Sequence, residues 1–167
     1  TTRFITTMLL KKLIKTSSNN IKNIKVSGIS LDSRKVKKNH LFFALKGTST
    51  HGEKFVNHAI KNGACAIISS KKLNLKNNKI PLIIVRDPKK TLERVCVNFF
   101  SKKPKNIIAV TGTNGKSSVA DFFHQILSYN KIPVASIGTL GVKANNKIFK
   151  SDLTSPDIIS LHQKLEK

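Results

Sequence analysis

Residues 112–118 place a glycine-rich turn, a lysine and two hydroxyls in a row, and together these groups can bind phosphate. The apolar segment 107–111 precedes them and predicts a strand. Apolar residues at helical spacing follow and predict an amphipathic helix: Val119, Phe122, Phe123, Ile126 and Leu127. A strand, a glycine loop and a helix in this order form the context of a P-loop, so the segment indicates an ATP site.

The residues of this loop have distinct roles in that interpretation. Backbone N–H groups from Gly112 to Lys116 can surround a phosphate, and the helix N-terminus adds partial positive charge. Lys116 is the candidate catalytic residue because its ammonium can reach the β- and γ-phosphates, and the Ser117 hydroxyl can ligate Mg²⁺. The expected cofactors are therefore ATP and Mg²⁺, held by Gly112, Thr113, Asn114, Gly115, Lys116, Ser117 and Ser118.

The spacing of the glycines leaves a plainer alternative open. Val110 stands where the common P-loop has its first glycine. In the alternative, the glycines only give the backbone freedom at a strand-to-helix turn, and a serine caps the helix.

Length and composition limit the remaining classes of protein. With 167 residues and 39% hydrophobic content, the chain can form one ordinary domain, or a small domain and part of another. Cys65 and Cys96 lie in apolar stretches without metal-like spacing, which predicts buried free thiols in a reducing compartment. No apolar run reaches the length of a membrane span and the start lacks a signal-peptide pattern, so we expect a cytoplasmic protein without a membrane partner.

The net charge of +23, from 31 basic and 8 acidic residues, raises the alternative of a nucleic-acid-binding module. The lysines are scattered rather than clustered, and the chain has one tyrosine and no tryptophan for base stacking. We therefore expect no nucleic-acid partner. A basic surface still attracts nucleotides and other anionic substrates.

Hydrophobic periodicity predicts an α/β protein. The strands expected in the first part are 24–29, 41–45, 64–69 and 81–86, and the helices are 9–14, 53–62 and one that begins at Asp87-Pro88. A polar, proline-containing break at 101–106 divides the chain into a first domain, 1–103, and a second domain, 104–167.

The second domain is expected to continue after the P-loop helix with a strand at 133–140 and a hairpin at 142–150 that turns at Asn145-Asn146. A last helix follows, with Ser155 as cap, Pro156 in the first position and Asp157 favouring the helix dipole. These elements cannot close a doubly wound sheet, so we expect only the first part of a mostly parallel-sheet ATP-binding domain. Residues 1–7 carry little pattern, and Met8 is a candidate start.

The run Thr-Gly-Thr-Asn-Gly-Lys-Ser at 111–117 resembles the ATP loop of the Mur ligase family, the ATP-dependent amide-bond ligases of peptidoglycan precursor synthesis. Ser117 replaces a more usual threonine and keeps the hydroxyl.

A second motif, Asp32-Ser33-Arg34, lies between two expected strands. By itself it is compatible with an ordinary turn. Together with the Leu-Phe-Phe-Ala strand that follows and a loop containing His51-Gly52, it resembles the small N-terminal UDP-binding α/β domain of two Mur ligases. The resemblance implies that the uridine nucleotide contacts Leu31, Ser33, Thr48, Ser49 and Thr50.

Three features are more similar to the ligase that adds the third residue of the stem peptide than to the one that adds the terminal dipeptide. They are Thr113-Asn114 between the loop glycines, the run Ile-Gly-Thr-Leu-Gly at 137–141, and the run Leu-Thr-Ser-Pro-Asp at 153–157. The last run implies that Thr154 and Ser155 bind the muramoyl-peptide side of the substrate, although a helix cap also accounts for Ser155.

The implied partners are UDP-N-acetylmuramoyl-L-alanyl-D-glutamate and an amino acid, meso-diaminopimelate or L-lysine, joined through an acyl phosphate by a monomer. The family's acidic Mg²⁺ ligand, carbamylated lysine and amino-acid-recognising motif lie further along than residue 167. We therefore expect these 167 residues alone to lack ligase activity. The dipeptide-adding ligase and a non-catalytic nucleotide-binding module remain the alternatives.

Overall fold

The computed structural model describes residues 7–14, 21, 23–46, 51–77, 79–139, 141–144, 147–149 and 157–166. The chain divides into two compact units, the first formed by residues 1–102 with 166–167 and the second by residues 103–165.

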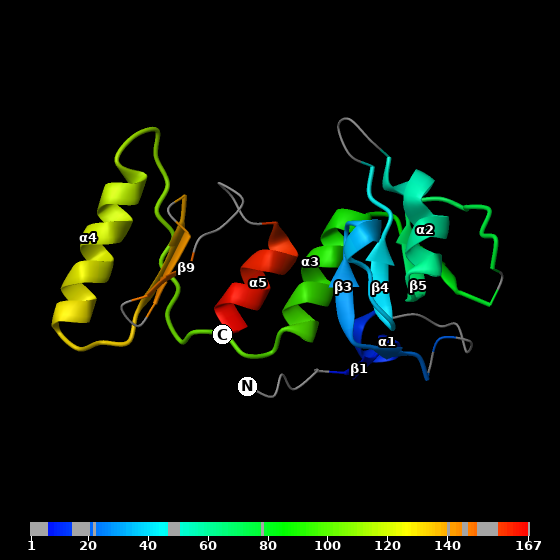
Figure 1. Ribbon diagram of the computed structural model, residues 1–167, viewed down its shortest axis with the longest axis horizontal. Coiled ribbons are helices and arrows are strands. Elements are labelled where there is room, and N and C mark those ends of the chain that lie inside the picture. The colour runs from blue at the N-terminus through cyan, green and yellow to red at the C-terminus, as the bar shows by residue number, and fades with distance from the viewer. Residues whose placement is uncertain are drawn as a thin grey trace. The chain divides into compact units, whose positions relative to one another are not determined.

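A parallel four-stranded sheet forms the centre of the first unit (Figure 1). Its strands lie in chain order: β3 (Gly28–Ser30), β4 (His40–Phe43), β5 (Ala64–Ser69) and β6 (Leu82–Ile84). This confirms the expected α/β class. The strand expected over 24–29 is split, because β2 (Lys25–Val26) pairs antiparallel with β1 (Met8–Leu9), whereas β3 pairs with β4.

The longest helix of the described first unit begins where the sequence provides a start signal. The helix α3 (Pro88–Phe99) has proline in its first turn, and the Asp87 carboxylate accepts a hydrogen bond from the Lys90 backbone N–H at 3.0 Å. The expected helix over 53–62 is a 3₁₀ turn, η3 (Gly52–Phe55), followed by α2 (Val56–Lys61). Two shorter elements complete the unit, α1 (Leu10–Leu13) and η2 (Ser33–Lys35).

Gly63 ends α2 as expected, with a left-handed φ of +102°. A Cβ at this position would lie 2.9 Å from Lys38 Cα, so both conformation and space require glycine.

The core of the first unit covers both faces of the sheet. Leu41, Phe42 and Phe43 are consecutive in β4 and all are 0% exposed. Because neighbouring side chains of a strand point to opposite faces, neither face of β4 is open to solvent. The helix α2 contacts β5, and α1 contacts α3 (Figure 1).

The two cysteines lie within the first unit. Cys96 is fully buried, as expected, and Cys65 is half-buried. Burial raises the pKa of the Cys65 thiol to about 11, so this thiol is a poor nucleophile near neutral pH.

The second unit contains the helices α4 (Lys116–Tyr129) and α5 (Ile158–Glu166) and the antiparallel strands β7 (Ala135–Gly138), β8 (Gly141–Ala144) and β9 (Lys147–Phe149). The expected hairpin is confirmed, and its turn residues Asn145 and Asn146 lie outside the described residues. The expectation of a parallel sheet is not met in the described part of this unit, where β7 pairs antiparallel with β8.

The strand expected at 107–111 is wrong, because this segment has no strand structure in the described chain. Ile107 and Ile108 are 60% and 63% exposed. An apolar run becomes a strand only where a neighbouring strand accepts its hydrogen bonds, and no described strand pairs with this segment.

The helix α4 is confirmed, but its apolar residues are not buried. Phe122 and Ile126 are 62% and 60% exposed. Within the described residues, the predicted apolar face of this amphipathic helix is therefore not packed into a core. Among those residues, no helix is both long and apolar enough to cross a membrane.

We predict that Phe42→Ala lowers the free energy of unfolding by about 3–5 kcal/mol, because the side chain is fully buried in a central strand. Phe55→Ala is the matched control, since Phe55 is 43% exposed and should cost less than about 1 kcal/mol. Chemical denaturation of the full chain measures both changes, and equal losses would contradict the described core.

Candidate functional site

The candidate phosphate loop leads directly into α4. Gly115 stands at the N-cap of this helix with a left-handed φ of +76°, and its carbonyl accepts the Val119 N–H at 2.9 Å. A Cβ on Gly115 would meet nothing within 4 Å. Glycine is therefore favoured here by backbone conformation rather than by lack of space.

The Lys116 side chain folds back over the loop. Its Nζ donates to the Gly112 carbonyl oxygen and, at 3.0 Å, to the Thr113 carbonyl oxygen. The Lys116 ammonium and the positive N-terminal end of the 14-residue helix thus both lie at the glycine loop. This donor set fits the anionic phosphates of a nucleotide.

The Ser117 hydroxyl has a hydroxyl neighbour from a different element. Its Oγ lies 3.3 Å from Oγ1 of Thr139, the residue that follows β7. No group of three or more His, Cys, Asp and Glu side chains in the described part of the chain could hold a metal ion. Hydroxyl oxygens suit Mg²⁺, which commonly takes few protein ligands and completes its shell with phosphates and water.

Thr139 was not identified as a site residue from sequence. The signal was available, because Thr139 lies in the run at 137–141 that the resemblance to the Mur ligases uses. Its proximity to Ser117 depends on the tertiary arrangement of α4, which contains Ser117, and β7, which precedes Thr139.

An ion pair joins the helix that follows the loop to the sheet of the second unit. Lys143 Nζ on β8 donates to Asp121 Oδ1 on α4, and Gln125 Nε2 donates to Asp121 Oδ2 at 2.8 Å. These bonds, the one from Lys143 first, lower the pKa of Asp121. The pair crosses 22 residues of sequence and could not be predicted from spacing.

In the first unit, the Asp-Ser-Arg motif forms η2 directly after β3. The Asp32 carboxylate accepts the Arg34 backbone N–H at 2.9 Å and the Arg34 guanidinium NH2 group at 2.7 Å. The hydrogen bond from the Arg34 side chain is the main reason why the pKa of Asp32 falls to about 2. The local turn is therefore held by its own side chains, as the plainer interpretation of this motif requires.

Ser33 turns away from solvent, unlike its neighbour Arg34. Ser33 is 5% exposed, and its Oγ lies 3.0 Å from His58 Nδ1. Leu31 is half-buried. The other expected substrate residues, Thr48, Ser49, Thr50, Thr154 and Ser155, lie outside the described residues.

Asp157 precedes α5 (Ile158–Glu166) and comes two positions after Ser155 in the sequence. Asp157 Oδ1 accepts the backbone N–H groups of Ile159 at 2.9 Å and Ser160 at 3.0 Å. The Asp157 side chain thus caps this helix, which begins at Ile158, whereas the sequence pattern predicted Ser155 as the cap and Pro156 in the first helical position.

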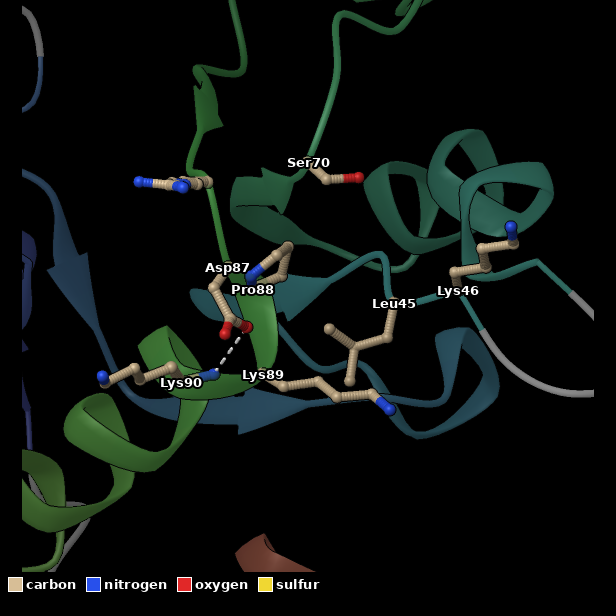
Figure 2. A pocket seen from close by; sticks show the side chains of 8 residues that line it. Leu45, Lys46, Ser70, Asp87, Pro88, Lys89 and Lys90 are labelled. Carbon is tan, nitrogen blue, oxygen red and sulfur yellow. Dashed lines mark hydrogen bonds between the residues drawn. The ribbon is translucent and has the colours of Figure 1, made fainter.

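A cavity of about 540 Å³ lies where β4, β5 and β6 end (Figure 2). It is lined by Leu45, Lys46, Ser70, Arg86, Asp87, Pro88, Lys89 and Lys90. Figure 2 shows Lys89 extending toward Leu45, whereas the Asp87 carboxylate is directed to the backbone of α3. Basic side chains and a helix N-terminus at one edge of a sheet favour an anionic ligand.

Sequence reasoning did not identify the cavity residues, although a signal exists. In parallel sheets ligands bind outside the carboxyl ends of the strands, and these residues follow β4, β5 and β6. The Leu31–Ser33 segment follows β3 and therefore belongs to the same edge.

Comparison with known proteins gives consistent matches. Residues 25–128 match the family model described as Mur ligase family, catalytic domain, and residues 110–167 match the Mur ligase middle domain. The chain is 41% identical over 142 residues to the UDP-N-acetylmuramoyl-L-alanyl-D-glutamate–2,6-diaminopimelate ligase of Brucella melitensis biotype 1. That match covers 85% of this chain and 29% of the relative, so the chain spans less than a third of the relative's length.

Two solved structures are also similar. A structure of a UDP-N-acetylmuramoyl-L-alanyl-D-glutamate–2,6-diaminopimelate ligase superposes with a TM-score of 0.74 and 28% identity, covering 96% of this chain and 33% of that one. The MurF ligase from Thermotoga maritima in complex with ADP superposes with a TM-score of 0.50 and 26% identity, covering 60% of this chain and 23% of that one.

We predict that Asp32→Asn destabilises the chain by at most about 1 kcal/mol near neutral pH, because its partner Arg34 is 81% exposed. The folded-state pKa of about 2 lies below the ordinary 3.8, so the contribution is complete above 3.8 and is lost as the pH falls through about 2. Denaturation of both proteins over an acidic pH series should show the difference shrinking. A difference that stays constant to the lowest pH, or one that Glu93→Gln reproduces, would contradict this account.

Proposed function

The chain belongs to the Mur ligase family, and from this premise we propose that it is part of an ATP-dependent amide-bond ligase. The proposed reaction adds 2,6-diaminopimelate to UDP-N-acetylmuramoyl-L-alanyl-D-glutamate in peptidoglycan precursor synthesis. The single observation that carries the catalytic part is the glycine loop at the start of α4, with the Lys116 ammonium over the loop carbonyls. The choice of amino acid, which the sequence left open, rests on the name of the Brucella relative.

In this proposal the second unit begins the ATP-binding domain, from residue 104. The backbone from Gly112 to Ser118 receives the phosphates, and Lys116 neutralises their negative charge. Ser117 is the one residue of this chain that we assign to Mg²⁺, with Thr139 beside it. Mg²⁺, when bound, would supply further neutralisation of the phosphate charge.

The first domain, residues 1–103, would bind the UDP end of the muramoyl-dipeptide. Leu31, Ser33 and residues 48–50 remain the proposed contacts. The cavity at the carboxyl ends of β4, β5 and β6 supports this assignment, because Lys46, Arg86 and Lys89 supply positive charge there. We assign Thr154 and Ser155 to the muramoyl-peptide side.

The proposed chemistry has two steps. The γ-phosphoryl group of ATP is transferred to the terminal carboxylate of the substrate, which yields an acyl phosphate and ADP. The amine of diaminopimelate then attacks the acyl carbon, an amide bond forms and phosphate leaves. Two anions meet in the first step, so alignment and fixed positive charge are the main requirements. We further propose that the protein acts as a monomer in the cytoplasm, where ATP is available.

A dipeptide-adding ligase is the second candidate, because the Thermotoga MurF structure also superposes on part of the chain. The two activities differ in substrate. A ligase of the first kind acts on the UDP-muramoyl-dipeptide, whereas one of the second kind acts on the tripeptide. Assay of the full-length protein with each substrate separates them.

We predict that Lys116→Ala in the full-length protein lowers turnover by about 100-fold or more, since it removes a charge that stabilises the transferred phosphoryl group. Affinity for the UDP-substrate should change little, because we assign that substrate mainly to the other unit. Lys72→Ala, at an exposed loop lysine, is the control for bulk charge. Near-normal turnover of Lys116→Ala would reject the P-loop assignment.

We predict that Ser33→Ala weakens binding of the UDP-muramoyl-dipeptide at least about tenfold, the effect of losing a hydrogen bond worth on the order of 1.5 kcal/mol. Calorimetric titration of the full-length protein measures the change. Ser101→Ala, at an exposed position, is the control and should bind the substrate normally. Unchanged affinity of Ser33→Ala would remove Ser33 from the site.

A further inference from the structure

Two residues, one in α2 and one at its C-cap, contact Ser33. His58 Nδ1 lies 3.0 Å from Ser33 Oγ, and Asn62 Nδ2 donates to the Ser33 carbonyl oxygen at 2.8 Å. His58 and Asn62 are four residues apart, so they lie on one side of the helix. One helix side thus contacts both the side chain and the backbone of the same serine.

The rest of the turn has supports other than His58 and Asn62. Asp32 binds the backbone and the guanidinium of Arg34, and its carbonyl oxygen accepts the Lys35 N–H at 3.0 Å. Val36, which follows η2, is buried in a cluster with Val56 and Ala59 of α2. The backbone of the turn therefore has several supports, whereas the Ser33 hydroxyl has His58 as its side-chain partner among the described residues.

A serine hydroxyl can donate one hydrogen bond and accept two. The bond to His58 uses one of these three, and a hydroxyl without such a partner would rotate among its staggered positions. A neutral imidazole whose Nδ1 accepts the serine proton leaves the serine lone pairs for a ligand N–H. A ring whose Nδ1 carries the proton leaves the serine O–H for a ligand oxygen.

We propose that His58 is a positioning residue for the nucleotide end of the substrate. It fixes the Ser33 hydroxyl so that its remaining hydrogen-bonding capacity faces the uridine nucleotide, and Asn62 holds the backbone beneath it. This inference rests on the proposed function, in which Ser33 contacts that nucleotide. Nothing in the sequence pattern pairs residues 33 and 58.

The test measures binding of UDP-N-acetylmuramoyl-L-alanyl-D-glutamate to the full-length protein. His58→Ala should weaken binding about tenfold, while kcat and the KM for ATP stay unchanged, because only the hydroxyl loses its orientation. His58→Asn should restore most of the affinity, since its amide can occupy the place of Nδ1. Lys61→Ala, at an exposed position on the same helix, is the matched control and should have no effect.

A double-mutant cycle separates this inference from the function on which it rests. If His58 acts through Ser33, the double variant Ser33→Ala with His58→Ala should bind no more weakly than Ser33→Ala alone. Weak binding by Ser33→Ala with normal binding by His58→Ala would overturn the positioning role and leave the proposed function standing. Normal binding by both variants would remove Ser33 from the site and reject both. A fall in kcat or thermal stability without weaker binding would show that His58 is only structural, and would also overturn the inference.

Discussion

The parallel arrangement of β3, β4, β5 and β6 is the constraint on which the first unit depends. Parallel strands end at the same edge, so every segment that follows a strand is delivered to one side of the sheet. Both faces of the sheet are covered, as the three consecutive buried residues of β4 show. The motif at Asp32, residues 44–46 after β4 and the cavity at the start of α3 all lie at the carboxyl edge.

Positive charge alone does not distinguish a binding site in this chain, because the net charge is +23. Geometry makes the distinction. Lys116 is itself exposed, but its ammonium is held by two loop carbonyls at the start of a 14-residue helix. A charge that is already in place loses less entropy when it meets an anion than a mobile side chain does.

Local signals were sufficient for much of the fold. The apolar run at 64–69 became β5 with its expected bounds, and Asp87-Pro88 started α3 because capping and a preset φ depend only on neighbouring residues. The strand prediction for residues 107–111 was wrong because a strand depends on a neighbouring strand, and a local sequence pattern does not show whether that neighbour is present. The sequence likewise could not pair Ser33 with His58 or Ser117 with Thr139, because these contacts join residues 25 and 22 positions apart.

These two contacts share a physical logic. Ser33 and Ser117 are the hydroxyls that we assign to the substrate nucleotide and to Mg²⁺, and each has a polar neighbour on a different element. A hydroxyl carries one proton on a rotating bond, so a ligand that needs a fixed lone pair must otherwise restrict that rotation when it binds. A protein partner restricts it beforehand. The local sequence motif therefore supplies the serine hydroxyl, whereas the tertiary fold supplies the partner that determines in which direction this hydroxyl can hydrogen-bond.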